Sequence, residues 1–225
     1  MKNFLFIIIL LLSSCSPSDD TKKSDNNLSN TNVEASDSAE KSENNSITNI
    51  ETSDEIKRII VGNKDAKITI IAFESLTCSH CANFHKDVYP ELKKNYLDTG
   101  LAKIEFRHFP LDIAAFNASK ISQCRNDGDS TILNSLFSNQ QKWVKGSSAA
   151  EANENLKKFL TSEGFNVDFE ACINNKEIED FVLNDRIDGV KKFKVNATPT
   201  IIINDKKFEK TLNFKNLKKV IEKLI

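Results

Sequence analysis

Two cysteines separated by two residues, Cys78 and Cys81, are the side chains of this sequence best suited to chemistry. They lie in the stretch FESLTCSHCANFH, residues 73–85, which also holds two histidines and a carboxylate. A cysteine pair at this spacing can close a disulfide and exchange it with another thiol, and the attacking species is the thiolate. The same side chains could also bind a metal ion, or the two cysteines could form a structural disulfide that never reacts.

Zinc is the main alternative, because cysteine and histidine are good zinc ligands and four of them lie here: Cys78, His80, Cys81 and His85. On one helix, however, residues 80 and 81 point about 100° apart and residue 85 lies five positions beyond residue 80, so the side chains do not converge on a tetrahedral site. The sequence has no second CxxC and no HxxxH. We therefore expect no metal, and we assign His85 and His108 to packing or local hydrogen bonds.

The residues before the pair predict a strand, and those after it predict a helix. KITIIAFE, residues 67–74, is apolar on both faces, which is typical of a central strand in a covered sheet. Thr77 is a good helix N-cap, and apolar side chains then recur every three or four residues as far as Tyr96. We expect this helix to end near Gly100, with a kink at Pro90.

This arrangement places Cys78 at the first helical position, where unpaired backbone N–H groups and the helix dipole favour a thiolate. Cys81 follows one turn later on the same face and is expected to be the more buried partner. His80 can donate a hydrogen bond to the Cys78 thiolate, or pair with it when charged, and each pKa unit that it lowers represents about 1.4 kcal/mol in favour of the thiolate. Stabilising the reduced form makes the disulfide a stronger oxidant.

The remaining pattern predicts few strands and many helices. AKIEFRHF, residues 102–109, alternates as a second strand, so that strand, helix and strand form a βαβ unit with a parallel pair. A long helical stretch follows over residues 113–190. A hairpin over residues 200–208, turning at Asn204–Asp205, and a helix over residues 213–224 complete the pattern. The predicted fold class is α/β, with a helical insert between a βαβ and a ββα half.

Two motifs, LTCSHCANFH before the insert and VNATPT after it, resemble those of the DsbA family of bacterial thiol–disulfide oxidoreductases, which have the thioredoxin fold. The resemblance covers residues 56–225. It implies that Cys78 is the sulfur attacked by a substrate and that Cys81 is the resolving cysteine. It also implies that Pro199 is a cis-proline facing the pair and that Thr198 positions an extended substrate through its backbone.

The sequence departs from the family pattern at three places. Family oxidants often carry Pro-His between the cysteines, whereas this chain has Ser79-His80, so the redox potential stays open. Ala197 stands where many relatives have glycine. The buried acid of many thioredoxin-like proteins lies six residues before the first cysteine, where this chain has Ala72. Glu74 could accept a proton from the second cysteine, but we interpret it as a solvated or hydrogen-bonded carboxylate at the strand end.

Two further cysteines, Cys124 and Cys172, lie 48 residues apart in the predicted insert. Single cysteines in helices make poor redox couples but can form a structural bridge. Some DsbA-like proteins have a second, non-catalytic disulfide in this subdomain, so the resemblance implies a Cys124–Cys172 disulfide. Two free buried thiols are the alternative.

The first fifteen residues predict export. Lys2 is followed by nine apolar residues, FLFIIILLL at 4–12, which are too few to span a bilayer but fit a signal peptide. LSSC, residues 12–15, resembles a bacterial lipobox, in which Cys15 becomes the lipidated first residue; cleavage among residues 13–18 without a lipid is the alternative. Both interpretations place the chain in an oxidising compartment, and removing Cys15 leaves an even four cysteines.

Residues 16–55 predict a disordered polar linker, because 33 of these 40 residues are Ser, Thr, Asn, Asp, Glu or Lys and none is aromatic. The predicted organisation is a signal peptide with lipobox over residues 1–15, this linker, and one domain over residues 56–225. The 31 basic and 32 acidic residues form no basic stripe, so we expect no nucleic-acid partner.

The sequence thus predicts a periplasmic or otherwise extracytoplasmic oxidoreductase, held to a membrane by a lipid at Cys15, that oxidises cysteine pairs in reduced exported proteins. No metal, nucleotide or flavin motif is present. The resemblance implies that a membrane oxidase restores the disulfide. A reductase or isomerase is the alternative within the enzyme class. A non-catalytic lipoprotein that binds extended peptides at Pro199, or one with an inert Cys78–Cys81 bridge, is the alternative outside it.

Overall fold

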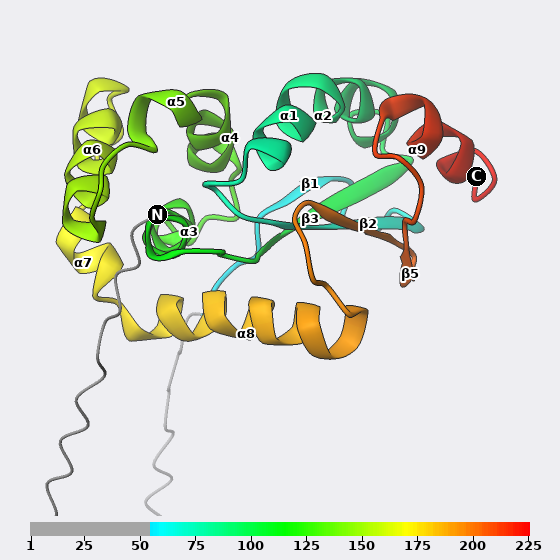
Figure 1. Cartoon of the computed structure of the whole chain (residues 1–225). Coiled ribbons are helices and arrows are strands. Elements are labelled where there is room, and N and C mark those ends of the chain that lie inside the picture. Colours follow the sequence, from blue (N-terminus) through cyan, green and yellow to red (C-terminus); the bar gives the residue numbers. More distant parts are fainter. Residues whose placement is uncertain (1–54) are drawn as a thin grey trace, which may run out of the picture. The chain divides into compact units, whose positions relative to one another are not determined.

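The computed structural model describes residues 55–225 (Figure 1). The predicted signal peptide, Cys15 and all but the last residue of the predicted linker lie outside these residues. Within the described part, helices cover a five-stranded mixed sheet. None of the helices there combines the length and the apolar character needed to cross a membrane.

The sheet has the strand order β1-β3-β2-β4-β5, and only β2 and β3 run parallel. The strands are β1 (Ile60–Gly62), β2 (Ile68–Glu74), β3 (Ala102–His108), β4 (Thr200–Ile203) and β5 (Lys206–Lys207). The predicted βαβ unit and the terminal hairpin are confirmed. Asn204 and Asp205 form the hairpin turn with φ values of 43° and 65°, which asparagine and aspartate tolerate better than most residues.

β1 was not expected from the sequence. It pairs with β3 at the edge of the sheet over only three residues, Ile60–Gly62. A run this short has no measurable alternation of apolar and polar residues, so its pairing is decided by the neighbouring strand.

β2 is the central strand, and its two faces contact different helices. Ile70 and Ala72 belong to the large core beneath α1 (Ser79–Asp87) and α9 (Phe214–Ile221). Ile71 and Phe73 belong to a second core on the side of α8 (Lys176–Phe193). Figure 1 shows α1 and α9 on one side of the sheet and α8 on the other. Since side chains alternate along a strand, position 74 falls on the α1 side with positions 70 and 72.

The helix predicted to run to Gly100 is divided into three pieces. It consists of α1, α2 (Tyr89–Leu92) and the π-helix η1 (Lys93–Leu97). The interruption falls at Val88, with φ −119° and ψ −47°, two residues before Pro90. Proline lacks an N–H and its ring clashes with the carbonyl four residues earlier, so the regular helix is disturbed here, although Leu92 N still donates to the Val88 carbonyl at 3.0 Å.

Six helices lie between β3 and β4 and form the predicted insert. They are α3 (Ile113–Gln123), α4 (Thr131–Ser138), α5 (Gln140–Trp143), α6 (Ala149–Ser162), α7 (Phe169–Ile173) and α8. The last of them approaches the sheet closely at Gly189, where an added Cβ would lie 2.9 Å from the Phe73 ring. Glycine at this position therefore lets α8 pack directly on the central strand.

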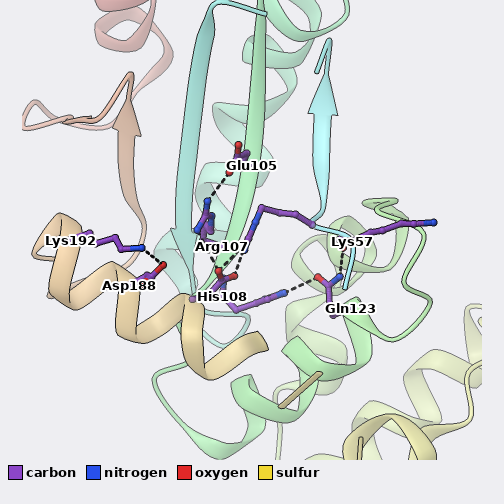
Figure 2. Close-up of polar contacts among 9 residues, drawn as sticks. Lys57, Glu105, Arg107, His108, Gln123, Asp188 and Lys192 are labelled. Atoms are coloured by element: carbon purple, nitrogen blue, oxygen red, sulfur yellow. Dashed lines mark hydrogen bonds and ion pairs between the residues drawn. The ribbon is translucent and has the colours of Figure 1, made fainter. Parts of the chain in front are cut away.

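A buried polar network joins α8 to β3 and to the segment before β1 (Figure 2). Asp185, only 2% exposed, accepts two hydrogen bonds from Arg58 Nη1, at 2.8 and 2.9 Å, and one from the His108 backbone N–H at 3.0 Å. His108 Nε2 donates to Gln123 Oε1 at 3.3 Å, and Gln123 Nε2 donates to the Lys57 carbonyl. These bonds agree with the expectation that His108 satisfies local hydrogen bonds, and they fix α3 and α8 against the sheet.

Candidate active site

The turn between β2 and α1 carries the CxxC pair, and its N-cap differs from the prediction. Cys78, with φ −78° and ψ 120°, is the N-cap of α1, and Thr77 lies one residue outside. The Thr77 hydroxyl does not cap the helix; it donates to Asp112 Oδ2 at 2.7 Å instead. The carbonyl of Cys78 accepts hydrogen bonds from Cys81 N and Ala82 N, both at 3.1 Å, and so begins the helical ladder.

Cys78 is the more exposed and more acidic thiol of the pair. Its pKa falls from the ordinary 9.0 to about 5, chiefly because the Cys81 thiol donates a hydrogen bond to the thiolate. The Thr198 side chain and the backbone N–H groups of Cys81 and His80 add to this lowering, and partial burial opposes it. At pH 7 a thiol with pKa about 5 is about 99% thiolate. The side chain is partly exposed, so a substrate can reach the sulfur.

Cys81 has the opposite properties. It is fully buried, and burial raises its pKa far above the ordinary value; the hydrogen bond to Cys78 and the charge of Glu74 raise it further. Cys81 therefore stays a thiol when Cys78 is ionised. Burial and hydrogen bonding thus give the two cysteines different exposure and ionisation, and Cys81 is the more buried partner, as predicted.

Thr198 and Pro199 face the pair across the turn. The Thr198–Pro199 peptide bond is cis, the conformation that the resemblance implied. Cys78 Sγ lies 3.3 Å from the Thr198 carbonyl and donates to it in the thiol form. The Thr198 hydroxyl is buried and has no partner, so it is free to donate to the thiolate.

A groove runs beside the reactive sulfur. It has a volume of about 460 Å³ and is lined by His80, Asn83, Phe84, Thr198, Pro199 and Phe214, among others. His80 is exposed, and its side chain forms no hydrogen bond with Cys78 within the described residues. Only its backbone N–H acts on the sulfur in this geometry. Tuning by the imidazole stays a prediction.

Glu74 lies beneath the pair and is not solvated. It is 5% exposed, and Oε2 shares a hydrogen bond of 2.9 Å with Nε2 of the buried His85. Glu74 Oε1 and His85 Nδ1 are buried without a partner. Burial raises the pKa of Glu74 despite the opposing effect of His85. The prediction allowed either a hydrogen-bonded or a solvated carboxylate at the strand end. The hydrogen-bonded form is confirmed, and the solvated form is wrong.

His85 joins this carboxylate to the helix that carries Cys81. It follows Cys81 by four residues on α1, and side chains at this spacing are neighbours on one helix face. The His85 ring stacks on Phe137 of α4 at 4.0 Å and on Phe106 of β3 at 5.4 Å. The expected packing role of His85 is confirmed, and the contact with Glu74 adds a buried acid–imidazole pair within one helical turn of Cys81.

Gln140 is a site residue that sequence reasoning missed. It is 7% exposed at the start of α5, and its Nε2 donates to the carbonyls of Leu76, at 2.8 Å, and Cys78, at 3.0 Å. The contact joins positions more than 60 residues apart, and no local pattern in the sequence indicates it.

Cys124 and Cys172 form a disulfide, with their Cα atoms 5.5 Å apart. It joins the end of α3 to α7 inside the helical insert, and Cys172 is buried. Cys78 and Cys81 are free thiols in this structure. Among the described residues, no three His, Cys, Asp or Glu side chains gather as a metal site would require.

Comparison with known proteins agrees with this geometry. The thioredoxin family model matches residues 54–223. The chain is similar to the solved structure of alpha-DsbA1 from Wolbachia pipientis, with a TM-score of 0.66 and 30% identity, covering 74% of this chain and 90% of that one. BdbD from Bacillus subtilis shares the fold at a TM-score of 0.56 and 24% identity, covering 74% and 91% of the two chains. The predicted α/β fold of thioredoxin type is confirmed.

Relatives identified by sequence are similar over the same domain. Disulfide bond formation protein D of Bacillus subtilis is 27% identical over 176 residues, which cover 73% of this chain and 75% of that protein. A relative from Rickettsia bellii, provisionally named a protein-disulfide oxidoreductase, is 27% identical over 150 residues, or 65% of this chain. The chain spans only 56% of the length of that rickettsial relative.

Proposed function

The chain belongs to the DsbA-like proteins of the thioredoxin family, and we propose that it is a protein thiol–disulfide oxidoreductase that introduces disulfides into exported proteins. The observation that carries the proposal is the contrast between the two cysteines at the start of α1. Cys78 is partly exposed and ionised at neutral pH, whereas Cys81 is buried and protonated. A couple with these properties exchanges disulfides through one accessible sulfur.

The reaction begins with the Cys78–Cys81 disulfide. A substrate thiolate attacks Cys78 Sγ and forms a mixed disulfide, and Cys81 leaves with the electron pair of the broken S–S bond and takes up a proton. The Glu74–His85 pair lies one helical turn from Cys81 and can supply that proton. A second substrate thiolate then attacks the substrate sulfur, and Cys78 leaves as a thiolate. The substrate is oxidised by two electrons and the CxxC pair is reduced.

The direction of transfer follows from the ionisation of Cys78. A low pKa stabilises the reduced form of the pair, and an oxidant is a couple whose reduced form is stable. The hydrogen bonds to Cys78 from Cys81, Thr198 and the helix N-terminus therefore favour an oxidase over a reductase or isomerase. The groove beside Thr198 and Pro199 offers a place for an extended substrate segment next to the sulfur.

The cellular setting is proposed from the N-terminal residues. The predicted signal peptide and lipobox support an extracytoplasmic protein anchored to a membrane through a lipid on Cys15. Reduced exported proteins are the proposed substrates. A membrane oxidase is the proposed partner that takes the two electrons from the reduced pair and closes the disulfide again.

Trapping of mixed disulfides tests the activity. A Cys81→Ala variant keeps the Cys78 sulfur but lacks the thiol that would break a mixed disulfide. We therefore expect it to accumulate mixed disulfides with exported proteins, which mass spectrometry can identify. Cys78→Ser is the matched control and should trap nothing. Full oxidation of a reduced model substrate by Cys78→Ser would show that the Cys78–Cys81 pair does not carry out this chemistry.

The equilibrium with glutathione tests the direction. An oxidase should have a potential well above the −270 mV or so of thioredoxin, toward the −120 mV or so of a strong oxidant of this kind. A value near that of thioredoxin would make the protein a reductase.

A further inference from the structure

We propose that Gln140 is a positioning residue for the CxxC couple: its side-chain amide, supplied by the helical insert, holds the active-site turn in the geometry that makes Cys78 reactive. The inference rests on the proposed thiol–disulfide exchange and assigns part of its control to a residue outside the CxxC and cis-proline motifs.

The amide of Gln140 spans the turn. Its Nε2 has two N–H donors, and they reach the two carbonyls that flank Thr77: Leu76 O at 2.8 Å and Cys78 O at 3.0 Å. Both donors are therefore used, and the side chain is 7% exposed, so water does not compete for them. A buried amide with both donors bound to two nearby carbonyls fixes their separation.

The carbonyl of Cys78 is the point through which this contact acts on the sulfur. That carbonyl also accepts from Cys81 N and Ala82 N and so starts α1. The position of the carbonyl sets where Cys78 Sγ lies relative to Thr198, 3.3 Å away, and to the N–H groups of the first helical turn. The Leu76 carbonyl accepts no other hydrogen bond among the described residues, so Gln140 is the group that fixes the direction of this carbonyl.

The insert holds Gln140 firmly. The side chain of Trp143, three residues later in α5, is fully buried, and its Nε1 donates to the Leu136 carbonyl of α4 at 2.9 Å. The next residue of α4, Phe137, stacks on His85 of α1. The insert thus contacts the active-site region at two places, the turn before α1 and the buried face of α1. The Gln140 amide is the contact through which α5 holds the turn in place.

Gln140→Met tests the inference because it keeps the length of the side chain and removes both donors. We expect the pKa of Cys78, followed by thiolate absorbance at 240 nm, to rise by about one unit, because the turn can relax away from its N–H donors. A tenfold weaker preference for thiolate should make the disulfide about tenfold less oxidising against glutathione, or about 30 mV.

Gln123→Met is the matched control. Gln123 is also buried, at 2% exposure, and its Nε2 also donates to a backbone carbonyl, that of Lys57, in the network of Figure 2. The control should be less stable to urea, but its Cys78 pKa and its equilibrium constant with glutathione should equal those of the wild type. If Gln140→Met behaves in the same way as Gln123→Met, Gln140 only packs and the inference is wrong.

A milder variant covers the case in which Gln140→Met does not fold. Gln140→Asn keeps the amide but is one methylene shorter, so it can reach only one of the two carbonyls. A smaller rise of the Cys78 pKa is expected, and an unchanged titration in the folded variant would overturn the inference. These outcomes are separate from the proposed function, which is tested with Gln140 in place and fails if the Cys81→Ala variant traps no partner.

Discussion

Replacement of Glu74 by glutamine is expected to stabilise the protein at neutral pH and to slow its disulfide exchange. The carboxylate is 5% exposed, and among residues 55–225 its one hydrogen-bond partner is His85, at 2.9 Å from Oε2, while Oε1 has none. Burial raises its pKa above the ordinary 4.5, so the ionised form is unfavourable inside the fold. Glutamine has the same shape, keeps a hydrogen-bonding group toward His85 and carries no charge.

The magnitude follows from proton linkage. Because the pKa of Glu74 is higher in the folded protein than in the unfolded chain, stability is fully present below pH 4.5 and is lost as the pH rises through the folded pKa. The loss is about 1.4 kcal/mol per pH unit while the unfolded chain has released the proton and the fold retains it. The Glu74→Gln variant has no such loss, so its advantage in free energy of unfolding should grow at that rate above pH 4.5 and then level off.

Urea unfolding at pH 4.5, 5.5 and 6.5, followed by the fluorescence of the buried Trp143, measures this difference when both disulfides are closed. Burial lowers the pKa of His108 and gives stability an opposite dependence on pH, but wild type and variant share it and it cancels. An advantage that does not change with pH would refute the reasoning. A variant that becomes relatively less stable as the pH rises would show that Glu74 is ionised and paired with a charged His85.

The exchange reaction gives the second readout of the same variant. If the Glu74–His85 pair supplies the proton to Cys81, formation of the mixed disulfide should slow by about 100-fold, the lower range for loss of a general acid. An unchanged rate of mixed-disulfide formation, measured by stopped flow with a thiol peptide, would assign the proton to another donor.

Three further predictions concern the thiol, the second disulfide and the buried network. The alkylation rate of Cys78 should reach half its maximum near pH 5, and a midpoint near 9 would contradict the assigned hydrogen bonds. A Cys124→Ser/Cys172→Ser variant should lose about 2–4 kcal/mol of stability to urea, because the bridge closes a long loop in the unfolded chain. Its exchange activity should be unchanged. A loss of activity at equal stability would give the bridge a redox role. Asp185→Ala should lose about 3 kcal/mol, since it leaves the Arg58 guanidinium partly buried without its carboxylate, and a loss below about 1 kcal/mol would show that water replaces the pair.

Most secondary structure around the site could be predicted because its signals are local. The apolar run of β2 and the alternation of β3 were read within one residue of the observed strands. The Asn204–Asp205 turn was located because both residues tolerate positive φ. The division of this helix at Val88 was not expected, since the pattern of apolar residues continues across it.

The N-cap shows how a tertiary contact overrides a local preference. Thr77 is a good capping residue by type, but its hydroxyl is oriented toward Asp112, 35 positions later, to which it donates a hydrogen bond, and Cys78 is the cap. This shift of one residue places the sulfur itself at the start of the helix. The sequence could not reveal it, because the competing acceptor lies on another element.

The sequence by itself determined the cysteine pair and its place between a buried strand and a helix, because spacing and periodicity along the chain carry that information, and the resemblance to a known family indicated the distant Thr198-Pro199 motif. Only the tertiary structure decided that Glu74 is buried against His85 and that Gln140 holds the turn of Cys78. Burial and hydrogen bonding between distant residues depend on which surfaces meet after folding. The chemistry of the two cysteines is thus written in the sequence, and its control is set by the packing of the helical insert and the sheet around them.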